Sequence, residues 1–258
     1  MCFSRGYTTR HGTIAYTSRP IVSPFQFSDP AVAAFVVIPL GLFAILVWGV
    51  MVVWRRAGAT PTESRRAGVM TALFAGLWMV LTWMAAASGI LQAWDSTPPP
   101  FALLVAGIVV VSTALAFGPP GRRLALHAPL WALVAVQSFR LPLELSMHAM
   151  YERGIMPGQM SYSGRNFDIV TGSTAVVVAL LVATGYAGRR LVAAWNILGF
   201  ALLINIVVVA ILSTPTFAFF GSDRLNTFVA GVPFVWLPAV MVSAALAGHL
   251  IIARAVTR

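Results

Sequence analysis

The sequence has no lysine, a single cysteine and only seven acidic residues among 258. Without lysine the chain has no side-chain primary amine, which excludes a retinal Schiff base and therefore a rhodopsin of the usual kind. The one cysteine, Cys2, excludes an intramolecular disulfide and a metal site built from several thiolates. The basic side chains other than histidine are 17 arginines.

Charge is scarce throughout the chain. Charged residues make up 9% of the sequence and hydrophobic residues 59%, and the mean hydropathy is +0.86. A soluble domain carries roughly 25% charged residues. Together with long apolar runs, this composition predicts an all-α integral membrane protein.

Motifs for cofactors and for soluble enzyme chemistry are also missing. The spacing of His11, His127, His148 and His249 matches no metal-binding pattern. His148 and His249 are expected at opposite membrane boundaries, so they could not hold one haem between them. The sequence has no phosphate-binding glycine loop and no serine- or zinc-hydrolase motif. We therefore predict no metal and no cofactor.

Apolar runs of about 20 residues predict membrane-spanning helices. They divide the chain into a tail, residues 1–30, and a seven-transmembrane-helix bundle, residues 31–258. The expected spans are 31–54, 68–93, 101–118, 128–150, 167–187, 191–213 and 231–253.

Arginines mark alternate loops of this bundle. The odd-numbered loops and the C-terminal tail hold Arg55, Arg56, Arg65, Arg66, Arg122, Arg123, Arg189, Arg190, Arg254 and Arg258. Short arginine-rich loops stay in the cytoplasm, so we predict the N-terminus outside and the C-terminus inside, in the bacterial inner (cytoplasmic) membrane. Since these arginines flank apolar spans, the net charge of +10 is a topology signal, and we predict no nucleic-acid partner.

The first 28 residues carry arginine, serine and threonine but no acid. They lack the apolar core of a secretory signal, and glycine and proline interrupt a transit-peptide-like helix. We expect a disordered tail or an extension from a mis-assigned start, with a transit peptide as the alternative.

The fourth predicted span contains a polar column. Gln137, Arg140, Glu144 and His148 follow steps of three or four residues, so they share one helix face. A charged group inside a span costs about 2.5–3.5 kcal/mol and normally faces protein or water. Pro142 lies within the column and predicts a kink, because it cannot donate to the carbonyl of Ser138.

A second polar group, Arg165, Asn166 and Asp168, opens the fifth span. Asp168 precedes a stripe of small residues that begins at Thr171, so it should face the bundle interior. Two readings stay open for these charges. They either serve a ligand, or form two structural ion pairs, Arg140 with Glu144 and Arg165 with Asp168. Asp168 could also simply favour the helix N-terminus, with Asn166 as its cap.

Two residues on later helices are expected at a similar depth. Asn205 either lines a site or joins helices as a polar contact. Trp236 either lines a site or belongs to the interfacial aromatic belt.

The segments RLPLEL (140–145) and GRNFD (164–168) resemble a motif pair in uncharacterised bacterial seven-helix integral membrane proteins. The resemblance covers the fourth and fifth spans and implies a membrane-helical fold. It implies no activity.

These residues predict an outward-opening polar pocket between the fourth and fifth helices. It would bind, and by acid–base chemistry transform, a lipid-like or small anionic molecule in contact with membrane lipids. The catalytic candidates are Glu144, Asp168 and His148. The ligand-binding candidates are Arg140, Arg165, Asn166, Gln137, Asn205 and Trp236. The alternatives are a proton-coupled transporter and a non-catalytic receptor or scaffold, so whether the protein is an enzyme stays open, as does its oligomeric state.

Overall fold

The computed structural model describes residues 29–258, and all regular secondary structure in this range is helical. The predicted all-α fold is confirmed. The α-helices are α1 (Pro30–Arg56), α2 (Pro61–Ala87), α3 (Pro100–Phe117), α4 (Pro119–His127), α5 (Leu130–Val136), α6 (Arg140–Glu152), α7 (Asp168–Ala183), α8 (Arg189–Leu212) and α9 (Ser243–Val256). Single turns of 3-10 helix are η1 (Ile90–Gln92), η2 (Gln137–Phe139), η3 (Gly158–Met160) and η4 (Phe228–Ala230), and η5 (Leu237–Val242) is a π-helix.

The predicted tail, residues 1–30, lies outside the described residues except for its last two. Asp29 caps α1 by accepting a hydrogen bond from the Ala31 amide at 2.9 Å, and Pro30 is the first residue of the helix. Proline suits this position because the first helical amide has no partner within the helix.

Five helices are long and apolar enough to cross a membrane: α1, α2, α3, α8 and the continuous helix formed by η5 and α9. Another apolar helix, α7, is shorter, with 16 residues. Large apolar side chains such as Trp48, Leu73 and Ile197 are mostly exposed on these helices, as expected for surfaces that contact lipid. The protein is therefore a membrane-embedded helical protein.

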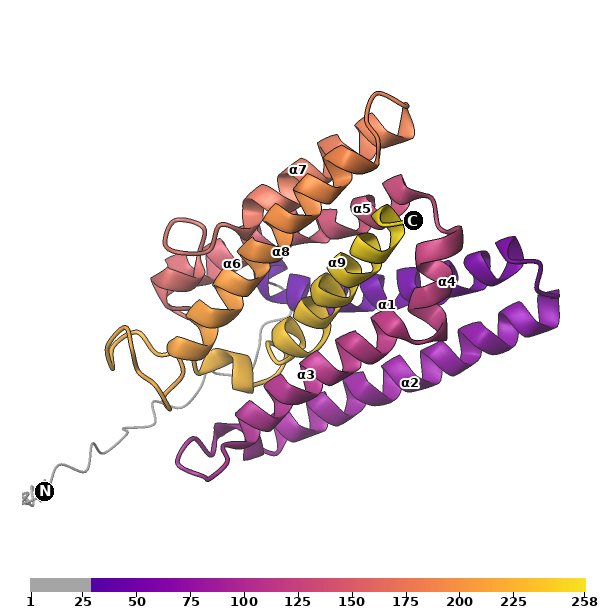
Figure 1. Ribbon diagram of the computed structural model, residues 1–258. Helices are drawn as coiled ribbons and strands as arrows, with labels where there is room; N and C mark the ends of the chain where they lie inside the picture. Colours follow the sequence, from indigo (N-terminus) through magenta and orange to yellow (C-terminus); the bar gives the residue numbers. More distant parts are fainter. Residues whose placement is uncertain (1–28) are drawn as a thin grey trace, which may run out of the picture.

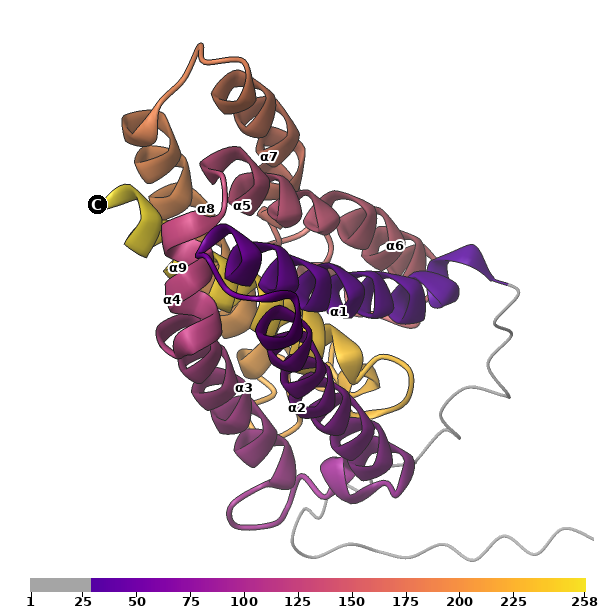
Figure 2. The ribbon, with the colours of Figure 1, turned by 90° about the vertical axis from the view of Figure 1, so that its right-hand side faces the viewer.

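The connections gather at two ends of the bundle (Figures 1 and 2). The α1–α2 turn, α4, the α7–α8 turn and the C-terminus lie toward one end, on the right in Figure 1. This end holds the arginine pairs that begin at Arg55, Arg65, Arg122 and Arg189, and we call it the arginine-rich end. The α2–α3, α6–α7 and α8–α9 connections lie toward the opposite end.

The predicted fourth helix, 128–150, consists of two α-helices joined by a single 3-10 turn. The α-helical hydrogen bonds stop at Val136, η2 follows, and α6 begins at Arg140. This interruption lies one turn before Pro142, which has no amide hydrogen for the carbonyl of Ser138. The α-helical hydrogen bonding is thus broken at the turn that contains Ser138.

The predicted starts of the second and last helices were wrong. The second helix begins at Pro61 rather than 68, because Thr60 and Glu63 form a capping box ahead of it. The third loop contains the short helix α4. The last helix begins at Leu237 rather than 231, and the residues before it form turns that include Pro233.

Close packing of α6 on α7 depends on Gly172. A Cβ atom at this position would lie 2.8 Å from the carbonyl carbon of Arg140 and 3.0 Å from the Cα of Leu141. Both are backbone atoms, which cannot move aside as a flexible side chain can. Glycine here allows the first turn of α6 to rest directly on α7, as small residues do between membrane helices.

Gly172→Ala should therefore separate α6 from α7 and lower the free energy of unfolding by about 1–3 kcal/mol. Thermal unfolding of the purified protein in detergent measures this change. Gly76→Ala is the matched control, because the nearest atom to its added Cβ is Phe43 Cε2 at 3.9 Å. Equal unfolding midpoints for the two variants would show that the close approach at Gly172 is unimportant.

Candidate functional site

An ion pair between α6 and α7 lies at the centre of the buried polar residues. Arg140 is the first residue of α6 and is 1% exposed, and Asp168 is the first residue of α7 and is 5% exposed. The Arg140 Nε donates to Asp168 Oδ2 at 2.7 Å, and Nη2 donates to the same oxygen. Thr171 donates to the other carboxylate oxygen. The carboxylate therefore has a partner on each oxygen.

Arg140 also contacts His249 of α9, and this contact defines the state of the imidazole. The distance from Arg140 Nη1 to His249 Nε2 is 2.8 Å. A guanidinium can only donate, so His249 Nε2 accepts and carries no proton. The proton of the neutral ring is then on Nδ1, which donates to Asn196 Oδ1 at 2.8 Å. The Asn196 amide in turn donates to the His249 backbone carbonyl at 3.2 Å.

Arg140, Asp168, Asn196 and His249 together form what we call the polar cluster. They come from α6, α7, α8 and α9, and each is at least 94% buried. Their hydrogen bonds satisfy one another across four helices. A network of this kind fixes how the helices pack, because breaking any link leaves a polar group unsatisfied in an apolar medium.

Glu144 lies one turn beyond Arg140 on α6 and has a different partner from the one predicted. Its Oε2 accepts a hydrogen bond from Asn166 Nδ2 at 2.7 Å. Asn166 also donates to the Met160 carbonyl and accepts from the backbone amide of Asp168, the first residue of α7, at 3.1 Å. The predicted structural pairs, Arg140 with Glu144 and Arg165 with Asp168, are therefore replaced by Arg140 with Asp168 and Glu144 with Asn166.

The remaining predicted site residues lie outside the polar cluster. His148 contacts Ser161 Oγ at 2.8 Å and stacks on Tyr162, near the opposite end. Arg165 is exposed, and its guanidinium lies over the Phe220 ring. Asn205 donates to the Arg165 carbonyl at 2.8 Å. Trp236 donates to the Met79 carbonyl and packs against Trp83 of α2.

Two members of the polar cluster were missed from the sequence. His249 was expected at a membrane boundary, and Asn196 was not among the predicted site residues. Gly199 is the signal that could have indicated both. It follows Asn196 by one turn, and a Cβ there would lie 2.8 Å from His249 Cε1. A polar residue followed by glycine on the same helix face marks a close approach of another helix.

A cavity of about 520 Å³ is lined by residues of α1, α2, α3, α4, α5, η2, η5 and α9. We call it the apolar cavity. Its few polar side chains include three hydroxyls, those of Thr71, Ser112 and Ser243, and each donates to the carbonyl four residues earlier in its own helix. The hydrogen atom of each of these hydroxyls is therefore already used in a hydrogen bond.

Gln137 is the exception in this wall. It is 0% exposed, and neither its Nε2 nor its Oε1 has a hydrogen-bond partner among the described residues. The amide lies against α9 at Gly248, where a Cβ atom would overlap Gln137 Nε2. Leaving a buried polar group unsatisfied costs about 1–3 kcal/mol, so these two atoms need an explanation.

The π-helix η5 also lines the apolar cavity, through Ala239 and Val240. The Ala239 carbonyl accepts a hydrogen bond from Trp78 Nε1 of α2 at 2.7 Å and from Ser243 Oγ at 2.8 Å. π-Helical turns are rare and occur often at functional sites. Their presence here supports a functional role for this wall.

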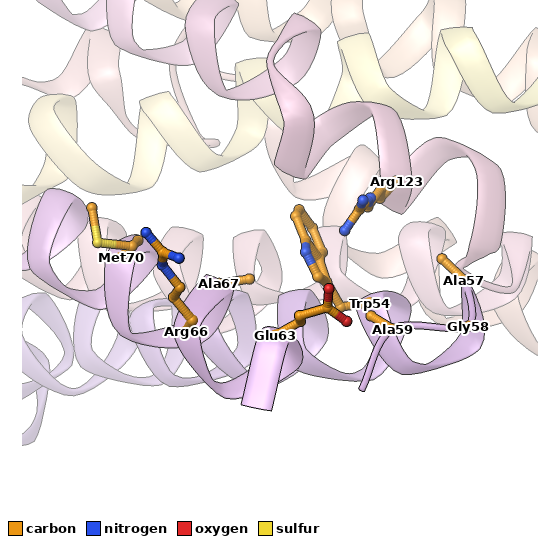
Figure 3. Close-up of a pocket in the computed structure, with 9 residues that line it drawn as sticks. All are labelled: Trp54, Ala57, Gly58, Ala59, Glu63, Arg66, Ala67, Met70 and Arg123. Carbon is orange, nitrogen blue, oxygen red and sulfur yellow. The ribbon is translucent and has the colours of Figure 1, made fainter. Parts of the chain in front are cut away.

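A second cavity, of about 500 Å³, lies at the arginine-rich end between the α1–α2 turn and α4. Figure 3 shows its lining, which includes Trp54, Glu63, Arg66 and Arg123. We call it the arginine cavity. No residue of α6 or α7 lines either of these two cavities, so the predicted pocket between those helices stays a prediction.

Asp168→Asn should lower the free energy of unfolding by about 3–5 kcal/mol, because it leaves the Arg140 charge buried without a counter-charge. The double variant Arg140→Met/Asp168→Leu should recover part of that loss, since neither charge remains. Unfolding in detergent measures both. Asp223→Asn is the control, because its pair with Arg224 is exposed and should not change stability measurably. A double variant whose loss equals the sum of the single losses would contradict a coupled pair.

Comparison of the chain with protein-family models, curated proteins and solved structures found no match. The resemblance of RLPLEL and GRNFD to bacterial seven-helix membrane proteins therefore stays a prediction. Function has to be inferred from the geometry of the polar cluster and the two cavities.

Proposed function

We propose that this protein is an integral membrane protein that binds a lipid-like molecule in the apolar cavity, with Gln137 as the polar contact. The observation that carries the proposal is the amide of Gln137. It is completely buried, it lines a cavity of ligand size, and both of its polar atoms lack a partner among the described residues. Ligand sites are typically apolar cavities of roughly 300–1,000 Å³ with few polar groups that fix orientation.

The two unpartnered atoms define the chemistry of the ligand head group. Gln137 Nε2 donates and Oε1 accepts, so a ligand that satisfies both must offer an acceptor and a donor close together. A hydroxyl group or an uncharged carboxylic acid meets this requirement. An ether or an ester does not, because it can only accept. The ligand class is therefore a long-chain alcohol or acid, with its chain along the apolar walls.

The rim of the apolar cavity faces lipid. Ile45, Trp48 and Phe74 line it and are at the same time 45%, 64% and 57% exposed. Trp131 of α5 is 44% exposed across the cavity from α1. A molecule dissolved in the bilayer would reach Gln137 sideways between α1 and α5, without passing through water.

Two residues of the polar cluster are close in sequence to the residues around the Gln137 amide. Arg140 follows Gln137 by three residues, and His249 follows Gly248, against which the Gln137 amide lies. The cluster therefore holds in place the two helices, α6 and α9, that position the amide. Catalysis by Glu144, Asp168 or His148 is not part of the proposal, since Asp168 is held by Arg140 and none of the three lines the apolar cavity.

Proton-coupled transport is the second candidate, and one observation favours it. The buried polar residues continue from Asn166 and Glu144 through the polar cluster to Asn196, so ionisable side chains of α6, α7 and α9 lie in one hydrogen-bonded group. A proton path needs such groups toward both faces. Proton-driven uptake in liposomes that disappears in Glu144→Gln would favour transport over binding.

The topology proposed with this function has seven spans: α1, α2, α3, the α5–η2–α6 unit, α7, α8 and the η5–α9 helix. The N-terminus is outside, and the arginine-rich end lies on the cytoplasmic side of a bacterial inner membrane. The arginine pairs at one end of the bundle support this orientation.

Gln137→Leu should weaken binding of hexadecanol by roughly ten- to thirtyfold, because two hydrogen bonds are lost. The same change should leave the ligand-free protein equally stable or more stable, because it removes an unsatisfied amide. Binding to purified protein in detergent and thermal unfolding measure the two effects.

Two comparisons make this test specific. The methyl ether of hexadecanol should bind the unmodified protein more weakly than the alcohol, and Ala244→Phe, which fills the cavity, should abolish binding of both. Gln159→Leu is the control for losing a buried glutamine, because Gln159 donates to Ser213 and to the Arg224 carbonyl and should be needed for stability. Equal binding of the alcohol by the Gln137→Leu variant would contradict the proposal.

The topology is tested by cysteine labelling in a Cys2→Ser background. Asp223→Cys, in the α8–α9 connection, should react with a membrane-impermeant maleimide in intact cells. Tyr186→Cys, in the α7–α8 turn and 86% exposed, should react only after permeabilisation. The reverse pattern would invert the orientation.

A further inference from the structure

The arginine cavity concentrates positive charge at one end of the bundle. Its walls come from the end of α1, the start of α2 and α4, and its charged side chains are Arg66, Arg123 and Glu63. Arg55 and Arg56 end α1, and Arg65 and Arg122 flank the two lining arginines in sequence. Positive charge therefore exceeds negative charge in and around the cavity.

The Glu63 carboxylate is held by the start of its own helix. Its Oε2 accepts from the Thr60 backbone amide at 2.8 Å and from the Thr60 hydroxyl at 2.8 Å, which completes the capping box of α2. Within residues 29–258, neither Arg66 nor Arg123 forms an ion pair with a carboxylate. Both guanidiniums therefore keep hydrogen-bond donors available for an anion.

Trp54 orients one of these guanidiniums. The Arg123 Cζ atom lies 4.1 Å from the centroid of the Trp54 ring. This cation–π contact holds the planar guanidinium in place. Guanidiniums fixed in this way suit the oxygen atoms of phosphate, which they bind in pairs.

The cavity continues into an apolar surface. Met70 lines it and is 60% exposed, and Leu73 and Leu77 follow on α2 with similar exposure. These side chains lie along a helix long and apolar enough to cross a membrane. A ligand with its phosphate group in the arginine cavity can therefore lay its hydrocarbon chain along α2, past Met70.

We propose that the arginine cavity binds the phosphate head group of an anionic phospholipid, with an acyl chain along the exposed face of α2. The site is separate from the apolar cavity and does not depend on the ligand proposed for Gln137. Free phosphate is the competing source of the same chemistry, and it lacks the chain that the α2 surface would hold.

The test is a titration of the purified full-length protein in detergent with phosphatidylglycerol, followed by native mass spectrometry. Arg66→Gln/Arg123→Gln should weaken binding about 25-fold, about fivefold for each arginine lost. Glu63→Gln should strengthen binding, because it removes a negative charge while glutamine keeps the capping box. A gain of affinity cannot result from misfolding.

Arg189→Gln/Arg190→Gln is the matched control, since it removes the same charge from the start of α8. It should weaken binding less than the substitution of the cavity arginines. Three results would overturn the proposal: an equal loss in both double variants, equal binding of phosphatidylcholine and phosphatidylglycerol, or displacement of the lipid by inorganic phosphate at similar concentration.

Discussion

The contact of Arg140 with Asp168 is the interaction on which the rest of the bundle depends. A guanidinium buried among membrane helices is tolerated only with a counter-charge and with partners for its other donors. Asp168 supplies the charge, and His249 accepts from the remaining nitrogen. Because these residues belong to α6, α7 and α9, satisfying one arginine fixes the positions of three helices, and Asn196 extends the constraint to α8.

This constraint also accounts for the place of the proposed ligand site. The chain between α5 and α6 changes from α to 3-10 geometry at η2, one turn before Pro142. Gln137 at the start of that turn lines the apolar cavity, whereas Arg140 at the start of α6 points into the polar cluster. One short stretch of chain thus separates a satisfied ionic network from an unsatisfied amide. The first is suited to hold helices, and the second to hold a ligand.

Much of the fold was predictable, because the lengths of the apolar segments and the positions of the arginines can be read directly along the chain. The spans around α1, α3 and α8 were found to within a few residues, and the burial of Arg140, Glu144 and Asp168 followed from their placement in apolar segments. The choice of partners was not predictable. Spacing of four residues suggested a pair of Arg140 with Glu144, but the Arg140 side chain reaches across to α7, where Gly172 lets the two backbones approach.

The sequence by itself determined that the protein is helical and membrane-embedded. Its apolar runs are long enough to cross a bilayer and carry little charge, and in lipid a helix satisfies the backbone hydrogen bonds of such a run. Only the tertiary structure decided which buried groups satisfy one another. Hydrogen bonding depends on distances of about 3 Å between helices that are far apart in sequence. His249 therefore became visible as a partner of Arg140, and Gln137 as an amide without a partner among residues 29–258, only once the helices were packed together.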